Sequence, residues 1–241
     1  MAKSVFHAAE TRGHANHGWL DAHHSFSFAG YQDRDRMHFG VLRVLNDDKI
    51  AGGMGFGSHP HDNMEIITIP LEGQLLHKDN MGNNGAVINP GDIQVMSAGT
   101  GVVHSEYNNT KTDLKLLQIW LFPNKQNVTP RYGQVSLNLA DRKNKFQQIL
   151  SPSETDEGVW IHQDAWFSLG VFEKDKAERY TIKKPGNGVY AFVISGTATI
   201  NGQELKTRDA YGIWDTDSFD INIASDNTEV LLMDVPMELP F

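Results

Sequence analysis

Short apolar runs separated by turn residues dominate the chain from residue 39 onward. Several of them alternate apolar and polar positions, as a half-buried β-strand does. They recur at intervals of about 8 to 12 residues, with Gly, Asn, Asp and Pro between them. This pattern predicts an all-β sandwich or barrel. The runs are FGVLRVL, MEIITIPLEG, DIQVMS, LKLLQIWLF, GVYAFVISG, TATINGQ, AYGIWD and TEVLLMDVP.

Helical periodicity is weak by comparison. The best helical candidate is the segment 139–149, which would also serve as a connector between two domains. Two Asn-Gly pairs, Asn84-Gly85 and Asn201-Gly202, predict tight hairpin turns of type I′. Such turns need positive φ at both central residues, and Asn-Gly tolerates this best.

The segments around the two Asn-Gly pairs share a faint repeat. In each segment a predicted strand is followed by a glycine, a short strand and a turn. A residue pair ending in Asp or Gly then precedes another strand. Two copies of one β module would account for 241 residues. We therefore expect two domains, residues 1–135 and 136–241. Ten of the eleven histidines lie within residues 1–104, so shared folds would leave the chemistry to the first domain.

Composition narrows the possible functions. The formal net charge of -9 gives no general attraction to nucleic acid or to anionic membrane faces. The absence of cysteine excludes disulfides, thiolate nucleophiles and sulfur-ligated metals. We expect no secretion signal, because residues 1–19 lack a basic region followed by an apolar one, and no apolar run approaches the ~18 residues of a membrane span. We expect a cytoplasmic protein.

Two pairs of metal-ligating residue types stand out. In GSHPHDNMEI, His59 and His61 project from the same face of a strand, and the same parity continues to Glu65. In GTGVVHSEYN, His104 and Glu106 are likewise two residues apart. An isolated His-x-His pair more often lies on the surface or caps an element than ligates a metal. Two such pairs on facing strands, however, would gather nitrogen and oxygen ligands suited to a divalent cation.

The same stretches resemble known motifs. GMGFGSHPHDNMEIITIPLEG resembles the first cupin motif, and GTGVVHSEYN resembles the second. Gly99 stands where the general second motif has proline, which concerns turn geometry rather than ligation. More narrowly, the N-terminal half resembles the pirin family, in particular its bacterial members with quercetinase-like activity. The stretches that carry this resemblance are RGHANHGWLDAHHSFSFAGY, HPHDNMEI, LEGQLLHKDNMGN, PGDIQVMSAGTGVVHSEYN and LQIWLFP.

The resemblance implies two cupin barrels (double-stranded β-helix, jelly-roll) in tandem, with metal in the first only. The implied ligands are His59, His61, His104 and Glu106, and Glu106 would also act as the catalytic base. Strand parity leaves Glu65 open as the carboxylate, and only the family comparison favours Glu106. The implied cofactor is one divalent metal ion, Fe(II) first. Mn, Co, Ni, Cu and Zn also accept nitrogen and oxygen ligands.

The implied reaction is the opening of a flavonol such as quercetin by dioxygen, with loss of carbon monoxide. A different small enediol or phenol is a further candidate substrate. The resemblance also implies a non-enzymatic alternative, an iron-dependent, redox-responsive co-regulator that contacts a transcription-related protein. In either case we expect no direct contact with nucleic acid, and a monomer.

The other histidines and aromatics have weaker interpretations. His77 is a candidate to line the cavity of the first barrel, whereas a structural role is expected for His14, His17, His23, His24, His38 and His162. An apolar wall for a planar ligand is a candidate role for Phe39, Phe56, Tyr107, Trp120 and Phe122. Aromatic residues on strands are, however, more often part of the core.

Overall fold

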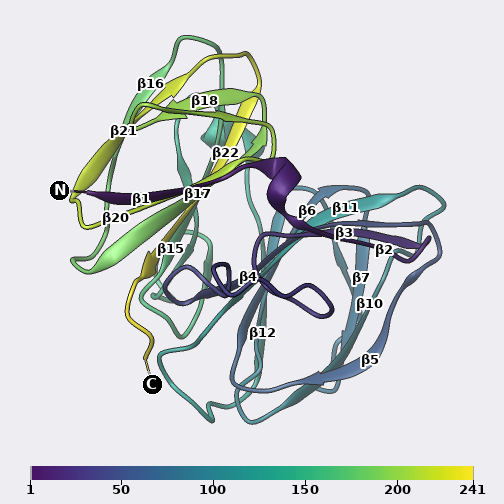
Figure 1. The fold of residues 1–241 in the computed structure, drawn as a ribbon. Helices are drawn as coiled ribbons and strands as arrows, with labels where there is room; N and C mark the ends of the chain where they lie inside the picture. Colours follow the sequence, from purple (N-terminus) through teal and green to yellow (C-terminus); the bar gives the residue numbers. More distant parts are fainter. Residues whose placement is uncertain (1, 241) are drawn as a thin grey trace.

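The computed structural model describes residues 2–240 and shows two β lobes that lie side by side (Figure 1). Within these residues there are strands and two short 3₁₀ helices, but no α-helix. No helix of the described chain is long and apolar enough to cross a membrane. The elements are β1 (Lys3–His7), η1 (Ala9–Thr11), β2 (Gly13–Asn16), β3 (Leu20–His24), β4 (Leu42–Ile50), β5 (Gly55–His61), β6 (Glu65–Glu72), β7 (Leu75–Asp79), β8 (Asn84–Ile88), β9 (Asp92–Ser97), β10 (Val102–Tyr107), β11 (Leu114–Leu121), β12 (Arg131–Ser136), η2 (Leu139–Arg142), β13 (Gln147–Ser151), β14 (Val159–Trp160), β15 (Trp166–Phe172), β16 (Ala177–Thr181), β17 (Asn187–Ser195), β18 (Thr197–Ile200), β19 (Gln203–Lys206), β20 (Ala210–Trp214), β21 (Ser218–Ile223) and β22 (Thr228–Pro236).

Each lobe consists of a seven-stranded and a four-stranded sheet. The first lobe has the strand orders β12-β9-β6-β11-β4-β3-β2 and β5-β10-β7-β8. The second has β1-β20-β17-β22-β15-β13-β14 and β16-β21-β18-β19. From β4 to β11 and from β15 to β22, corresponding strands occupy corresponding places in the two lobes. The all-β prediction is confirmed, and the repeated module is present in the topology.

Strand β1 crosses from one half of the chain to the other. It pairs antiparallel with β20, with Val5 opposite Gly212, and so completes the large sheet of the second lobe. In Figure 1 the purple β1 lies among the green and yellow strands. We propose that the domain boundary lies near residue 135 and that β1 is an element the first half contributes to the second sheet.

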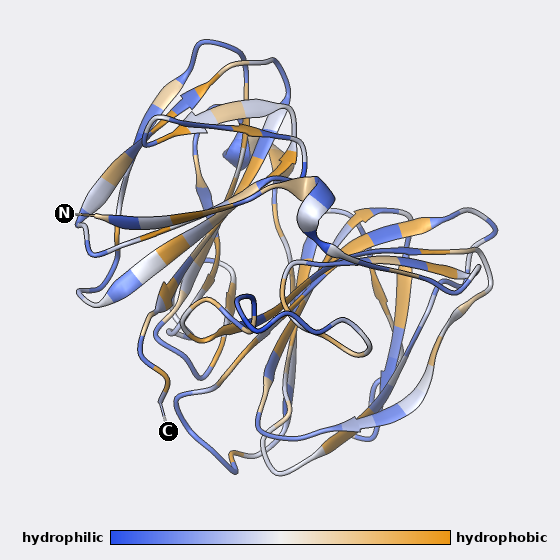
Figure 2. Cartoon of the chain, viewed as in Figure 1, coloured by the Kyte–Doolittle hydropathy of each residue, from blue (hydrophilic) through white to orange (hydrophobic). Residues whose placement is uncertain are grey.

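One apolar core spans both lobes. Leu42 and Ile119 of the first lobe belong to the same buried cluster as Phe167 and Leu231 of the second. Apolar and polar residues alternate along many strands, as Figure 2 shows, and this alternation places one face of each sheet inward. The lobes are therefore held together by shared apolar burial.

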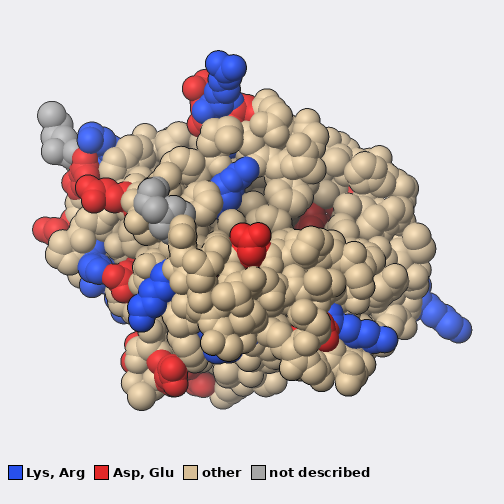
Figure 3. Space-filling view, turned by 90° about the horizontal axis from the view of Figure 1, so that it is seen from below, with Lys and Arg blue, Asp and Glu red and all other residues tan. Residues whose placement is uncertain are grey.

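Charged side chains are sparse and of mixed sign on the face shown in Figure 3. The described residues of this face form no continuous basic stripe of the kind that binds a phosphate backbone.

Two local predictions were wrong. The segment 139–149 is not one helix, because only Leu139–Arg142 is helical and β13 begins at Gln147. Asn144 has a φ of 55°, which is not helical, and its N–H donates a hydrogen bond to the carbonyl oxygen of Val171. The segment therefore leaves the helical conformation and bonds to β15. The pair Asn84-Gly85 lies inside β8, at a register shift opposite β7, and not in the turn. The turn at Asn201-Gly202 is confirmed, with positive φ at both residues between β18 and β19.

Candidate metal centre

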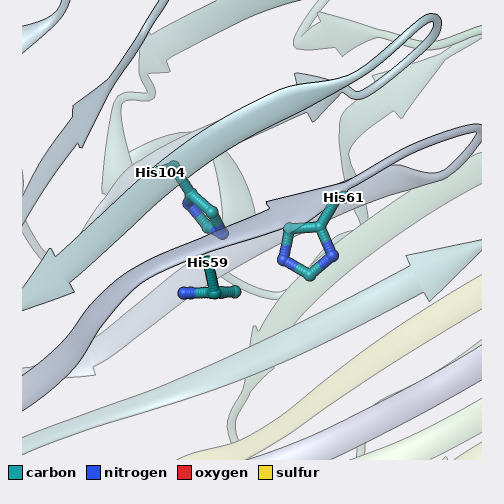
Figure 4. A group of neighbouring side chains, drawn as sticks. All are labelled: His59, His61 and His104. Carbon is teal, nitrogen blue, oxygen red and sulfur yellow. The ribbon is translucent and has the colours of Figure 1, made fainter.

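Three histidines meet on the four-stranded sheet of the first lobe. Strands β5 and β10 pair antiparallel with His59 opposite His104, and His61 lies two residues further along β5. The ring centroids of His59 and His104 are 4.4 Å apart, and that of His61 is 4.9 Å from each of the others. Figure 4 shows the three rings converging from the two neighbouring strands.

A bulge in β5 helps to orient His59. Between His104 and Glu106 of β10, strand β5 carries an extra residue. The bulge is next to Gly57, whose carbonyl oxygen lies 2.7 Å from Nδ1 of His59. Because the carbonyl can only accept, Nδ1 donates the proton and Nε2 is left with its lone pair free.

The donor set fits a cation. His104 is buried, and neither of its ring nitrogens has a hydrogen-bond partner. Burial, followed by the charge that His59 carries when it is protonated, lowers the pKa of His104 to about 3. The same two causes lower the pKa of His61 to about 4. Both rings are neutral at pH 7, which is the protonation state that ligates metal.

Glu106 lies beside this group together with His77. Nitrogen or oxygen atoms of His77, His104 and Glu106 fall within 4.8 Å of one another, as do those of His59, His61 and His104. The Gln118 side chain donates a hydrogen bond of 2.9 Å to Oε2 of Glu106. Burial raises the pKa of Glu106, and the nearby His77 opposes this shift. His104 is thus common to both groups.

His77 is buried next to His104 and does not line the cavity beside the histidines. Its Nε2 lies 3.0 Å from Asp79, and its ring is 1% exposed. The other ring nitrogen, Nδ1, has no hydrogen-bond partner. The carboxylate therefore fixes the orientation of this ring next to His104.

Glu65 lies on a different sheet from the histidines. It begins β6 of the large sheet, opposite Ser97, and Ser97 Oγ donates a 2.7 Å hydrogen bond to its carboxylate. Burial raises the pKa of Glu65 to about 7, although Ser97 and Arg131 oppose the shift. No group of three clustered ligand residues in the described chain includes Glu65.

A cavity of about 400 Å³ adjoins the histidines. Its aromatic residues include Phe56 and Trp120, which the sequence suggested for this role, and Trp19 and Phe28, which it did not. The His61 and Trp120 ring centroids are 4.9 Å apart and nearly perpendicular. The full lining is Trp19, Leu20, Ala22, His24, Phe28, Asn46, Asp48, Gly55, Phe56, Gly57, His59, His61, Glu106, Gln118 and Trp120.

Three of the suggested wall aromatics lie elsewhere. Phe39 packs against Tyr190 and Trp214 in the core between the lobes. Phe122 packs against the same core, and Tyr107 is 41% exposed. Tyr107 adjoins Glu106 in sequence and therefore points to the opposite face of the sheet.

The polar floor of the cavity was missed in the sequence. His24 Nδ1 and Asn46 form a hydrogen bond of 2.8 Å. Asp48 is 5% exposed, its Oδ1 has no hydrogen-bond partner, and burial raises its pKa to about 8. The available signal was the placement of His24, Asn46 and Asp48 at the alternate positions of β3 and β4 that also carry Leu20, Ala22 and Ile50.

The remaining histidines lie away from the cavity. His14 and His23 stack on each other near Asp21 in an exposed or half-buried position on β2 and β3. His38 bonds the carbonyl of Gly40, and His162 packs against Trp160. His17 follows β2 and bonds the carbonyl of Leu20 through its backbone.

The equivalent sheet of the second lobe has an apolar interior. Strand β16 pairs with β21 there as β5 pairs with β10 in the first lobe. Tyr180, Phe219 and Ile221 of these strands belong to a buried apolar cluster. Among the described residues, each group of clustered metal-ligating side chains lies in the first lobe.

Comparison with known proteins agrees with both halves of this architecture. The pirin family model matches residues 5–121, and the model of the quercetinase C-terminal cupin domain matches residues 148–235. A quercetin 2,3-dioxygenase of Escherichia coli K12 is 46% identical over 229 residues, which is 95% of this chain and 96% of the relative. The chain belongs to the pirin family. A pirin-like protein of Caulobacter vibrioides is 39% identical over 92% of this chain and 95% of its own length.

Solved structures of other proteins show the same two-lobed fold. The E. coli bacterial pirin YhhW in complex with nickel(II) has a TM-score of 0.90 and 42% identity, over 97% of this chain and 99% of its own. A quercetin 2,3-dioxygenase from Acinetobacter baumannii has a TM-score of 0.76 at 20% identity, over 98% and 88%. The latter likeness shows the fold alone. The two tandem cupin barrels are confirmed, and the nickel complex together with the histidine cluster supports a divalent metal in this pirin-family chain.

Proposed function

We propose that this pirin-family chain is a metal-dependent dioxygenase that opens the ring of a flavonol such as quercetin. The observation that carries the proposal is the convergence of His59, His61 and His104 at an apolar cavity with aromatic walls, next to the buried carboxyl of Glu106. Relatives of high similarity over nearly the whole chain that bear the name quercetin 2,3-dioxygenase support it.

The proposed ligands are the three histidines and Glu106. These four residues would hold a divalent ion and leave part of its surface open to a small ligand in the cavity. A bound divalent metal would supply a Lewis acid and a path for electrons from the flavonolate to dioxygen. Fe(II) is the metal that we propose, and the nickel complex of the bacterial pirin shows that the relative accepts another ion.

The protein's own residues would bind and deprotonate the substrate. Trp19, Phe56 and Trp120 would hold a planar ring system and exclude water from the reacting edge. Gln118 donates a hydrogen bond to Oε2 of Glu106. Once released from the metal, the Glu106 carboxylate would accept the proton of the 3-hydroxyl group through Oε1. Dioxygen is then the oxidant, and one ring carbon leaves as carbon monoxide.

Quercetin itself provides the test. Anaerobic, iron-loaded protein should shift the flavonol absorption band on mixing, and admission of oxygen should bleach the band and release carbon monoxide. The Glu106→Gln variant should still bind the flavonol but turn over about a hundredfold or more slowly. Folded, metal-loaded protein that neither shifts nor bleaches the band would overturn the proposal.

The redox-responsive co-regulator stays an alternative, tested by capture of partners in both iron oxidation states. The monomeric state and the cytoplasmic location also stay predictions.

A further inference from the structure

A second cavity, of about 530 Å³, lies at the junction of the two lobes. Its walls come from β6 and the turn before β9 in the first lobe, from η2, and from β15 and β22 in the second. It shares no lining residue with the cavity beside the histidines. This size is typical of a site for a small organic molecule.

The lining combines apolar surface with a buried cation, Arg142. Ile69, Leu71, Leu139, Val171 and Phe172 supply apolar surface from both lobes. Arg142 ends η2 and is only 6% exposed. Its Nε and Nη2 atoms are buried and have no hydrogen-bond partner. Because an unpaired buried guanidinium is costly, this arrangement calls for an anionic partner.

The nearby acidic groups do not supply that partner. Asp92 already accepts hydrogen bonds from Ser136 and Gln134, and Glu173 pairs with Lys143 at 3.2 Å. Glu229 lines the same cavity and its charge favours the charged form of Arg142, but no hydrogen bond or ion pair within 4 Å joins the two among the described residues. Burial raises the pKa of Glu229 and so disfavours its charged form, although the charges of Arg142 and Arg208 oppose this shift.

We propose that this cavity binds a small organic carboxylate, with its carboxyl group on Arg142 and its apolar body between the two lobes. The adjacent Nε and Nη2 atoms of a guanidinium match the two oxygens of a carboxylate, which makes such a contact bidentate. The site is distinct from the proposed dioxygenase centre and does not depend on its activity.

Calorimetric titration with 2-naphthoate tests the proposal, with the uncharged 2-naphthamide as the shape control. The wild-type protein should bind the carboxylate at least about tenfold more tightly than the amide. Arg142→Gln should remove this preference, and Glu229→Gln should strengthen carboxylate binding by removing a competing negative charge.

Two further variants keep the test informative if Arg142→Gln does not fold. Leu139 is 55% exposed on η2, so Leu139→Glu should fold normally and weaken carboxylate binding by charge repulsion. Arg34→Gln removes an exposed cation outside the cavity and should leave binding unchanged. Equal affinity for acid and amide, no binding of either, or unchanged binding in the Leu139→Glu variant would overturn the proposal.

Discussion

At the scale of single residues, Glu65 and Glu106 show that strand parity alone does not predict which carboxylate lies near the histidines. Each has the parity to share a face with a histidine pair, and both are buried. Pairing between distant strands separates them, because Glu106 lies opposite His77 whereas Glu65 lies opposite Ser97. The sequence could predict which histidines share a strand face, but the choice of carboxylate required the long-range register.

Glu65 should make the protein less stable as pH rises. Its pKa is about 7 in the folded chain against 4.5 unfolded, so the folded state keeps a proton that the unfolded state releases in this window. Stability is therefore fully present below pH 4.5 and decreases towards pH 7, by roughly 3 kcal/mol in all. Glu65→Gln should remove this decrease, and urea unfolding at pH 4.5 and pH 8 measures it. Parallel stability curves for variant and wild type would contradict the assignment.

At the scale of elements, the β5–β10 pair sets the geometry of the histidine cluster. Gly55 begins β5, and a Cβ added there would lie 2.2 Å from the carbonyl oxygen of Glu106. Backbone atoms cannot yield as a flexible side chain does, so an added methyl group pushes the strands apart. Strand pairing also explains why the turn predicted at Asn84-Gly85 was wrong. Asn-Gly suits a tight turn, but here the pair forms a bulge within β8, opposite β7.

Gly55→Ala should therefore reduce both stability and metal retention. We expect a loss of about 1 to 3 kcal/mol in the free energy of unfolding, and a lower metal content after dialysis, since His59 moves away from His104. Gly57→Ala is the matched control, because a Cβ at Gly57 meets no atom within 4 Å. If the two variants retained metal equally, close packing at Gly55 would not position the cluster.

At the scale of the whole molecule, the two lobes share one topology, but the clustered metal-ligating side chains of the described residues lie in the first lobe. The repeat and the histidine asymmetry were visible in the sequence. The pairing of β1 with the second sheet could not be predicted from the sequence. Its partner β20 lies near the other end of the chain, and the sequence of a short strand does not determine which strand it pairs with. His7 ends β1, is buried, and bonds Tyr190 of the second lobe through Nδ1 at 2.8 Å.

Because of His7, the free energy of unfolding should decrease as the pH falls. Burial, followed by the charge of Arg36, lowers its pKa from 6.5 to about 4. Between these values the unfolded chain binds a proton that the folded chain does not, so stability is present above pH 6.5 and is lost towards pH 4. His7→Gln keeps a polar partner for Tyr190 and should reduce the acid loss by roughly 2 kcal/mol. Thermal unfolding at pH 7 and pH 4.5 measures the difference, and an unchanged acid loss would contradict it.

The central claim is that His59, His61, His104 and Glu106 of the first lobe hold one divalent cation. The most direct measurement is metal content by elemental analysis after dialysis against apo buffer. The wild-type protein, Glu65→Gln and His162→Ala should each retain about one ion per chain, whereas His59→Ala and His104→Ala should retain almost none. Folded His59→Ala and His104→Ala variants with wild-type metal content would contradict the account.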